Sequence, residues 1–353
     1  MSQLDEPALY ALDREDMFGH IRALGSELIN AWDASAEMCL PKGVAHATGV
    51  VVAGMGGSAT GGDYFAALCQ PTATIPVVVI RGYELPNWVS ERTLVVVATH
   101  SGNTAEALSC YHDARRRGAM LLVLTMGGEL AECTARDHVA IHHLTYDAPP
   151  RAALAHSLAP LLRVGTKLEL CDVGDAAVRS AGEQHSALVD DHIGPSQPTK
   201  HNGSKQLAES LDGRFVMIFA AEHLTSVARR FRNQLSENGK TLGSFEMLPE
   251  ANHNFVVGLG TATGIAGSLA AVMLESRLYD DRVRRRFDVT ADLLTEVGIP
   301  VRRVELGGAT ILEQLLQGTA WGDYTSCYLG LLNGFDPTPI PQIDRLKAAL
   351  RGV

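Results

Sequence analysis

Residues 50–63 have the sequence Val-Val-Val-Ala-Gly-Met-Gly-Gly-Ser-Ala-Thr-Gly-Gly-Asp, which joins a short β-branched run to a glycine-rich stretch. The run at 50–53 shows no polar alternation, which is typical of a strand buried on both faces of a parallel sheet. Glycines let a chain turn sharply, and a helix that starts after the turn offers free N–H groups to an anion. The stretch therefore predicts a strand, an anion-binding loop and a helix.

Two well-known glycine-rich loops do not fit this stretch. A dinucleotide fingerprint would have a third glycine where Ala59 stands, and an acid where the second expected strand ends in Arg81. A phosphate loop of the Gly-Lys-Ser/Thr type is also absent. The alternative is a tight turn whose glycines serve only packing. Five glycines in nine positions favour a ligand loop, in which Gly56, Gly57 and Ser58 are the candidate binding residues.

Strand-like and helix-like stretches alternate along most of the chain. We expect strands at residues 50–53, 76–80, 93–98, 121–125, 139–144, 215–220, 244–248 and 301–304. We expect helices at residues 13–32, 62–69, 104–117, 151–170, 226–236, 264–278 and 311–328, and in a short tail at the end. This alternation predicts an α/β fold with doubly wound parallel sheets in three αβα layers.

The length of 353 residues is too great for one ordinary hydrophobic core, so we expect two α/β domains. The expected parts are an N-terminal helical segment at 1–48, a first domain at 49–150, a helical linker at 151–200, a second domain at 201–334 and a C-terminal tail at 335–353. Proline-rich turns mark the ends of both domains, near residues 149–150 and 337–341.

The composition excludes several classes of protein. Lysine plus arginine number 30 and aspartate plus glutamate 40, so the net charge of −10 disfavours binding to nucleic acid. No run of about 18 apolar residues predicts a membrane span, and the acidic first ten residues do not resemble a secretory signal. The six scattered cysteines form no Cys-x-x-Cys pair, which favours free thiols in a reducing cytoplasm.

A second polar loop follows the third expected strand, where residues 99–104 have the sequence Thr-His-Ser-Gly-Asn-Thr. Ligands of open α/β sheets bind outside the carboxyl ends of the strands, so this loop and the glycine-rich loop are expected to share one site. Thr99, Ser101 and Thr104 supply hydroxyl groups, and Asn103 or Thr104 can cap the following helix. Together the two loops predict a site that holds a phosphomonoester by amides and hydroxyls.

The second half of the chain adds three further motifs. They are Asn-Gln-Leu-Ser-Glu-Asn-Gly-Lys at 233–240, Leu-Pro-Glu-Ala-Asn-His-Asn at 248–254, and Asp-Pro-Thr-Pro at 336–339 followed by Ile-Asp-Arg-Leu-Lys at 343–347. The two loops of the first half are similar to those of the sugar isomerase (SIS) domain, which binds phosphosugars. With the later motifs, residues 40–353 resemble the bifunctional phosphoglucose/phosphomannose isomerases of archaea and bacteria.

The resemblance implies a fold, a reaction and a set of residues. It implies two SIS domains and an aldose–ketose isomerisation of glucose 6-phosphate and mannose 6-phosphate to fructose 6-phosphate through an enediol, without metal or organic cofactor. The implied catalytic residues are Glu237 as the base, with His253 and Lys347 for ring opening. Arg151 matches an arginine that contacts the phosphate or the sugar. The family also implies a homodimer in which His253 acts in the partner subunit's site.

Some assignments depend on the resemblance alone. Spacing does not choose between Glu237 and Glu250 as the base, because each carboxylate precedes a polar turn. The resemblance assigns the base to Glu237 and leaves Glu250 as a residue that shapes the turn. The loop at 99–104 departs from the family's Ser-Tyr-Ser-Gly-Asn-Thr, because Thr99 adds a methyl group and His100 replaces a tyrosine. His100 either adds charge near the phosphate at low pH or only packs.

Two other functions stay open at this point. One is an SIS isomerase of another sugar phosphate, since no residue reports the stereochemistry at C2 on inspection. The other is a phosphosugar-binding regulator without catalysis. Against the regulator, a sensor needs the phosphate loops but not Glu237, His253 and Lys347 together, and residues 1–48 lack a recognisable DNA-binding helix.

Overall fold

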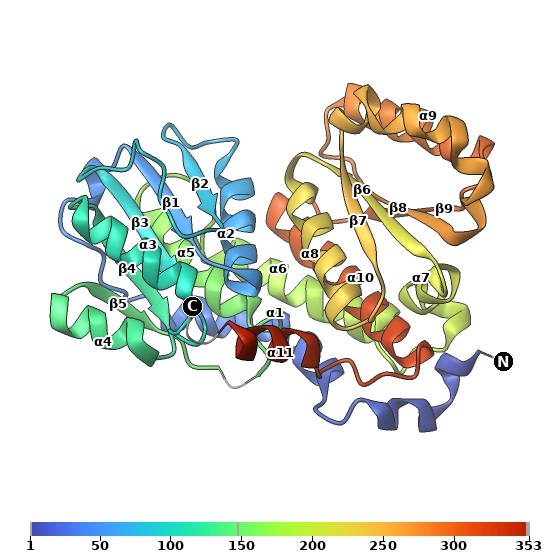
Figure 1. Cartoon of the computed structure of the whole chain (residues 1–353), viewed down its shortest axis with the longest axis horizontal. Coiled ribbons are helices and arrows are strands. Elements are labelled where there is room, and N and C mark those ends of the chain that lie inside the picture. The colour runs from blue at the N-terminus through green and yellow to red at the C-terminus, as the bar shows by residue number, and fades with distance from the viewer. Residues whose placement is uncertain (1, 147, 351–353) are drawn as a thin grey trace. The chain divides into compact units, whose positions relative to one another are not determined.

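A computed structural model describes residues 2–146 and 148–350 and divides the chain into two compact units (Figure 1). Unit 1 consists of Met1–Arg22, Ala187–Gly307 and Gln317–Val353, and unit 2 of Ala23–Ser186 and Gly308–Leu316. Each unit contains one parallel sheet. The domain boundaries expected from the sequence stay a prediction. The structure groups both ends of the chain with the second sheet, because the first 22 residues and the last 37 fall in unit 1.

The sheet of unit 2 has five parallel strands in the order β2-β1-β3-β4-β5. The strands are β1 (Gly49–Ala53), β2 (Val77–Ile80), β3 (Thr93–Ala98), β4 (Met120–Thr125) and β5 (Ala140–His143). The connecting helices are α2 (Gly56–Cys69), α3 (Ala105–Arg116), α4 (Gly128–Asp137) and α5 (Leu154–Lys167). β1 pairs with β2 on one side and β3 on the other, so the strand order reverses at β1.

Helices cover both faces of this sheet. Val51 and Val95 on one face pack in a core that includes Tyr111 of α3 and Leu130 of α4. On the other face α2 packs so closely that a Cβ on its Gly62 would lie 2.9 Å from Val52 Cγ1. α5 lies against α2, because a Cβ on Gly61 would lie 2.4 Å from Ser157 Oγ. The unit therefore has the three αβα layers that the sequence predicts.

The sheet of unit 1 repeats this topology with four parallel strands in the order β7-β6-β8-β9. The strands are β6 (Phe215–Ala221), β7 (Gly243–Leu248), β8 (Leu269–Ser276) and β9 (Val301–Leu306). The helices are α7 (Gly203–Leu211), α8 (Thr225–Glu237), α9 (Asp281–Glu296) and α11 (Pro341–Ala349), with a 3₁₀ turn η7 (Glu250–His253) after β7. Three helices, α1 (Met17–Ala34), α6 (Asp175–Leu188) and α10 (Ile311–Leu332), run from one unit into the other.

The two faces of the second sheet are covered by different helices. Gly318 of α10 lies against Leu306 of β9 and Val227 of α8, which places α8 and α10 on one face. Arg303 of β9 donates to Asp288 of α9 at 2.6 Å. Residues 303 and 306 differ by an odd number, so their side chains point to opposite faces and α9 covers the second one. The layer order is again αβα.

The expected helix at 264–278 is wrong, because residues Leu269–Ser276 form β8 in the middle of the second sheet. Ala270, Ala271, Met273 and Leu274 have good helix propensity, which explains the error. The same residues are buried, and β8 pairs with β6 on one side and β9 on the other. Burial on both faces and pairing on both edges override a weak local preference.

A buried lysine ties the N-terminal segment to unit 1. Lys205 Nζ donates to the carbonyl oxygen of Leu4 at 2.9 Å and to that of Pro195 at 3.1 Å. The ammonium also lies 3.4 Å from the Asp5 carboxylate and 5.6 Å from the Tyr10 ring. Burial lowers the pKa of Lys205, and these acceptors replace the water that its charge loses. The first residues of the chain are therefore part of the unit.

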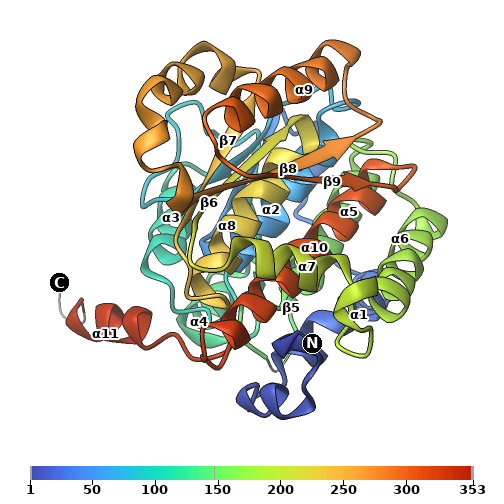
Figure 2. The same cartoon turned by 90° about the vertical axis from the view of Figure 1, so that its right-hand side faces the viewer.

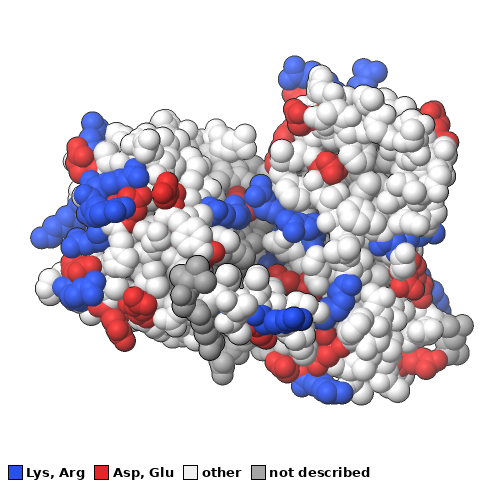
Figure 3. All heavy atoms as spheres, in the orientation of Figure 1, with Lys and Arg blue, Asp and Glu red and all other residues white. Residues whose placement is uncertain are grey.

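The surface carries charged side chains of both signs (Figure 3). On the face drawn in Figure 3, acidic and basic side chains are interspersed, and uncharged residues cover most of the area. No helix among the described residues is long and apolar enough to cross a membrane. All six cysteines are free thiols, of which Cys39 is exposed and the others are buried.

Candidate functional site

The glycine-rich stretch of unit 2 forms the first turns of a helix. The sequence predicts this helix only from residue 62, whereas α2 begins at Gly56. The first N–H groups of a helix have no intrahelical acceptor, and here they belong to Gly56, Gly57 and Ser58. Gly56 is exposed, and the other two are partly exposed. The candidate binding residues therefore lie at the positive end of α2, where an anion is stabilised.

Close packing accounts for other glycines of this stretch. A Cβ on Gly54 would lie 2.7 Å from the carbonyl oxygen of Ala98, and one on Gly57 would lie 2.5 Å from that of Pro150. Gly56 differs, because its φ of 50° is left-handed and no atom lies within 4 Å of its Cβ position. Packing thus accounts for Gly54 and Gly57, whereas Gly56 is not explained by packing, and the ligand-loop interpretation stays a prediction.

Arg151 lies beside this helix start. A Cβ on Gly57 would lie 3.3 Å from Arg151 Cα, so the two backbones are in contact. The Arg151 side chain is buried with 5% of the residue exposed. A buried guanidinium is held by partners, and its fixed charge favours an anion nearby. The structure therefore brings this predicted contact residue to the glycine-rich turn.

The loop after β3 leaves the same edge of the sheet. Thr99 is buried, and its hydroxyl is hydrogen-bonded to that of Thr104 at 2.9 Å. Thr104 takes the N-cap position of α3 but makes no capping bond, so its hydroxyl serves the loop instead. Ser101 is exposed, and Asn103 donates its N–H to Ser101 Oγ at 3.2 Å. Because β1 pairs with β3, the hydroxyls of Thr99, Ser101 and Thr104 lie at the same edge as the α2 amides.

His100 is the second residue of this loop, and its side chain contacts Tyr146. Its ring meets Tyr146 edge-on with centroids 6.4 Å apart, and Tyr146 lies 4.6 Å from the ring of His156. Glu27 Oε2 is 3.8 Å from His156 Nε2. Burial lowers the pKa of His156 and raises that of Glu27 to about 7, so the low-dielectric surroundings disfavour charge on both. The His100 ring packs against Tyr146, which is one of its two predicted roles, and the addition of charge near a phosphate stays a prediction.

Glu237 is the last residue of α8 in unit 1 and is partly exposed. The sequence predicts a left-handed terminator at Gly239, but the residue with positive φ is Lys240, at 51°. Gly239 is required for another reason. A Cβ there would lie 2.8 Å from the carbonyl oxygen of Leu235 and 3.1 Å from that of Ser326 in α10. The turn after Glu237 is therefore pressed against α10.

A row of buried polar side chains fixes α8 on α10. Arg230 donates to the Asp323 carboxylate at 2.6 Å, and Gln234 Nε2 donates to the same carboxylate at 3.0 Å. One turn further, Asn238 Nδ2 donates to Ser326 Oγ at 3.2 Å. These three residues of the α8 segment are spaced four apart, which places them on one face of the helix. That spacing of polar residues was visible in the sequence, but its function was not.

His253 is the last residue of η7 and is exposed. The turn is held on both sides of it. Asn252 Nδ2 donates to Thr290 Oγ1 of α9 at 2.8 Å, and Asn254 Nδ2 donates to Glu250 Oε1 at 2.8 Å. Glu250 is thus engaged within its own turn, in keeping with the shaping role that the resemblance implies.

Lys347 lies on α11, which extends away from the end of α10 in Figure 2. α11 has no buried residue, and its Leu346 is 59% exposed. The start of the tail is held by Lys240, whose Nζ donates to the carbonyl oxygen of Pro337 at 2.9 Å and to that of Glu237 at 2.5 Å. The three predicted catalytic residues therefore belong to three segments of unit 1, and Lys240 joins two of these segments.

The point where strand order reverses in unit 1 is filled by side chains. The Tyr279 hydroxyl accepts from the N–H of Ala221 at 3.2 Å and donates to the carbonyl oxygen of Leu274 at 3.1 Å. Glu222 Oε1 accepts from the N–H of Asp280 at 3.1 Å. The N–H groups of Ala221 and Asp280 are therefore satisfied within the unit. An anion loop like that of unit 2 is not formed by these residues.

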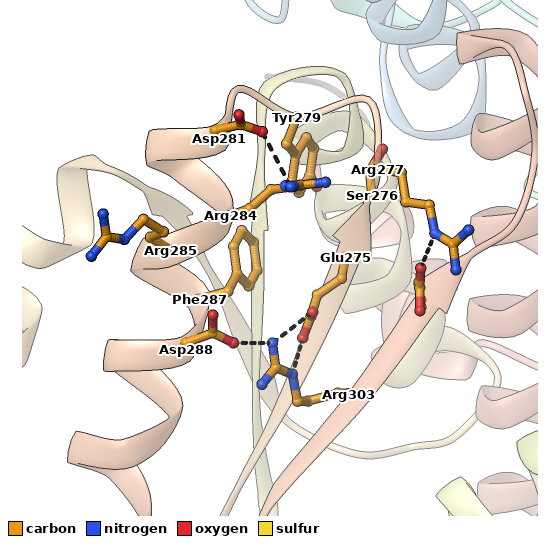
Figure 4. Close-up of a pocket in the computed structure, with 11 residues that line it drawn as sticks. Glu275, Ser276, Arg277, Tyr279, Asp281, Arg284, Arg285, Phe287, Asp288 and Arg303 are labelled. Carbon is orange, nitrogen blue, oxygen red and sulfur yellow. Dashed lines mark hydrogen bonds and ion pairs between the residues drawn. The ribbon is translucent and has the colours of Figure 1, made fainter.

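Unit 1 also has a cavity of about 510 Å³ between α9 and strands β8 and β9 (Figure 4). Its charged groups are largely paired with one another. Arg303 contacts the carboxylates of Glu275 and Asp288, and Arg284 lies 3.2 Å from Asp281. A phosphate in this cavity would meet carboxylates as well as guanidinium groups. None of the predicted site residues lines it.

The sheet edge of unit 2 has the groups of an oxyanion site. Within residues 2–146 and 148–350, no group of three or more histidine, cysteine, aspartate or glutamate side chains is arranged to hold a metal ion. The groups that the structure places at this edge are the amides of α2 and the hydroxyls of the loop after β3. These are ligands for an oxyanion.

Known proteins are similar to this chain over nearly its whole length. Residues 200–350 match the family described as the bacterial phospho-glucose isomerase C-terminal SIS domain. The bifunctional phosphoglucose/phosphomannose isomerase of Caldicellulosiruptor bescii is 33% identical over 335 residues, which cover 95% of this chain and 98% of that protein. The Aquifex aeolicus protein of the same name is 27% identical and covers 86% of this chain and 90% of its own length.

A solved structure supports the fold. A hypothetical protein from Thermus thermophilus superimposes with a TM-score of 0.73 over 98% of this chain and 94% of its own, at 17% identity. At this level of identity the likeness concerns architecture alone. It agrees with two units that each have an αβα layer order.

The double variant Ser58→Ala/Thr104→Val should weaken the binding of inorganic phosphate by about 100-fold or more. Hydrogen bonds to a charged group contribute about 1.5–3 kcal/mol each, and this variant removes two hydroxyl donors from the sheet edge. Isothermal titration of phosphate measures the change. Ser26→Ala is the matched control, because Ser26 is exposed on α1 in the same unit. Equal affinities of the double variant and the unmodified protein would remove these loops from the site.

Proposed function

The chain belongs to the family of bifunctional phosphoglucose/phosphomannose isomerases, and we propose that it interconverts glucose 6-phosphate and mannose 6-phosphate with fructose 6-phosphate. The observation that carries the proposal is similarity to such an isomerase through both units. Similarity confined to the phosphate loops would suit a phosphosugar-binding regulator equally well. This chain also has Glu237, His253 and Lys347, for which a regulator has no use.

The reaction requires three kinds of group. A proton moves between C1 and C2 of the open-chain sugar through a cis-enediol, so a base must lie over these carbons. An acid and a base must first open the ring, and an anchor must hold the phosphate. No hydride is transferred. We place the reaction in carbohydrate metabolism, in glycolysis and gluconeogenesis, and in a reducing cytoplasm, which the free cysteines fit.

Unit 2 is proposed to hold the phosphate. The amides of Gly56, Gly57 and Ser58 at the start of α2 favour an anion, and the hydroxyls of the β3 loop lie at the same sheet edge. The buried Arg151 beside Gly57 adds a fixed positive charge that contacts the phosphate or the sugar. These donors bind the phosphate group, so C1 and C2 of the sugar stay accessible to the catalytic residues.

Unit 1 is proposed to supply the groups that move protons. Glu237 is the base, and the bonds of α8 to α10 hold its backbone in place. His253 and Lys347 open the ring, because an imidazole can give or take a proton near neutral pH and an ammonium can donate one. Both of these side chains are exposed in a single chain, as residues that act in a shared site would be.

The proposed activity is tested with a coupled assay that starts from fructose 6-phosphate. We expect both glucose 6-phosphate and mannose 6-phosphate to form, in a reaction that an excess of EDTA leaves unchanged. Formation of only one aldose would restrict the substrate range. Binding without turnover would instead indicate a phosphosugar-binding regulator, and loss of turnover that zinc restores would refute the metal-free mechanism.

The variant Glu237→Gln should lower kcat by about 10²–10⁴-fold or more, because general-base catalysis contributes about that much. The amide keeps the shape of the side chain but accepts no proton, so KM should change little. Steady-state kinetics with fructose 6-phosphate measure both. Glu250→Gln is the control, since the Glu250 carboxylate accepts a hydrogen bond from Asn254 in its own turn. If Glu250→Gln is the inactive variant of the two, the roles of these carboxylates are reversed.

The protein is also proposed to be a homodimer in which His253 of one chain serves the site that contains Glu237 of the other. Closed two-fold dimers are the commonest assembly of soluble chains. Mixing inactive Glu237→Gln with inactive His253→Ala subunits should then restore activity. Each heterodimer would have one site with both lesions and one site with neither, and therefore about half of a dimer's activity. Heterodimers that form by mass measurement but stay inactive would show that each site is built within one chain.

A further inference from the structure

The turn after Glu237 is bonded to the start of the C-terminal tail. Asn333 Nδ2 donates to the carbonyl oxygen of Gly239 at 2.9 Å and lies 3.2 Å from Thr241 Oγ1. Lys240 adds the bond to the carbonyl oxygen of Pro337. Both contacts lie within unit 1. The turn at residues 239–241 is therefore bonded to Asn333, just before the tail, and to Pro337 within the tail.

Lys240 does more than cap a helix. A lysine near a helix C-terminus commonly bonds to the last carbonyl groups, as Lys240 does with Glu237 at 2.5 Å. Its second acceptor belongs to Pro337, 97 residues further along the chain. Lys240 also has a φ of 51°, a conformation that is unfavourable for a residue with a Cβ. The strained backbone of Lys240 allows its ammonium to bond to both the end of α8 and the start of the tail. We interpret this as a specific bridge between the two segments.

The start of the tail is also held by burial and by local backbone bonds. Thr338 is buried, and its N–H donates to Asp336 Oδ1 at 2.9 Å, so the proline-rich turn is ordered. From Pro341 onwards α11 buries no residue. Residues 336–340 therefore set the direction of α11 within unit 1. Among the bonds described for this turn, the one from Lys240 reaches the helix that ends in Glu237.

We propose that Lys240 is a positioning residue that fixes the tail to the end of α8, so that Lys347 is presented to the same substrate as Glu237. The inference rests on the proposed roles of Glu237 and Lys347. Lys240 does not touch the substrate in this proposal. It fixes the position of the first residues of the tail relative to the end of α8. The Lys347 ammonium, at the other end of the tail, is thereby held in a defined position relative to the Glu237 carboxylate.

The test uses Lys240→Met in the full chain, which keeps the length of the side chain and removes its donors. Hydrogen–deuterium exchange should become about 10-fold faster for amides 336–350, because the tail loses an anchor and opens more often. The kcat for fructose 6-phosphate should fall by about 10²-fold, the cost of a small misplacement of a catalytic group, with KM little changed. Lys240→Arg, which can still bond to two carbonyl groups, should restore most of both properties.

A double-mutant cycle separates positioning from a general loss of structure. If Lys240 acts through Lys347, then Lys240→Met should lower kcat far less in a Lys347→Ala background than in the unmodified chain. A general folding defect would lower kcat equally in both backgrounds and would refute the proposal. Lys200→Met is the matched control, because Lys200 is exposed in the same unit, and it should change neither exchange nor kcat.

The outcomes for Lys240 and for the proposed function are distinct. Unchanged exchange at 336–350 in Lys240→Met, or faster exchange with unchanged kcat, would overturn the positioning role. Absence of isomerase turnover in the unmodified protein would overturn the proposed function instead, and the exchange experiment would still report whether Lys240 holds the tail. Should Lys240→Met fail to fold, Lys240→Gln carries the same test with a shorter donor.

Discussion

The pairing of β1 with β3 is the contact on which the site of unit 2 depends. It brings the ends of two strands together at the point where the strand order reverses, so that two loops leave the sheet side by side. The approach is so close that Gly54 has no room for a Cβ beside the carbonyl oxygen of Ala98. The amides of α2 and the hydroxyls of Thr99 and Thr104 lie at the same edge of the sheet because β1 pairs with β3.

The two units share a topology and differ in how the reversal point is used. In unit 2 glycine and serine leave backbone amides available at the start of α2. In unit 1 Tyr279 accepts from the N–H of Ala221 and Glu222 from that of Asp280, and the proposed catalytic residues lie at the end of α8, after β7 and in the tail. Two units of the same topology can therefore have different functions, because the side chains at a few loop positions decide which backbone groups are accessible to a ligand.

Sequence patterns predicted the fold class because it depends on features that are local in the chain. The unbroken apolar runs of β1, β3 and β6 gave strands in the right places, and the glycine-rich turn gave the switch point. β8 was mistaken for a helix because alanine, methionine and leucine suit helices, whereas pairing with β6 and β9 is a long-range effect. The bridge from Lys240 to Pro337 was also beyond local patterns, since its partners are 97 residues apart. The resemblance named Glu237, His253 and Lys347; spacing alone left Glu237 and Glu250 equal.

The polar row between α8 and α10 has a consequence for evolution of this helix. A helix with a purely apolar inner face can slip by a turn and still bury similar area, but α8 cannot. A slip of one turn would put Gln234 where Arg230 meets Asp323, and the carboxylate would lose its cation while staying buried. The same slip would displace Glu237 by about 5.4 Å along the helix axis. Substitutions on the outer face of α8 can therefore accumulate without moving the Glu237 carboxylate. Its position along the helix axis is fixed by the bonds of Arg230, Gln234 and Asn238 to α10.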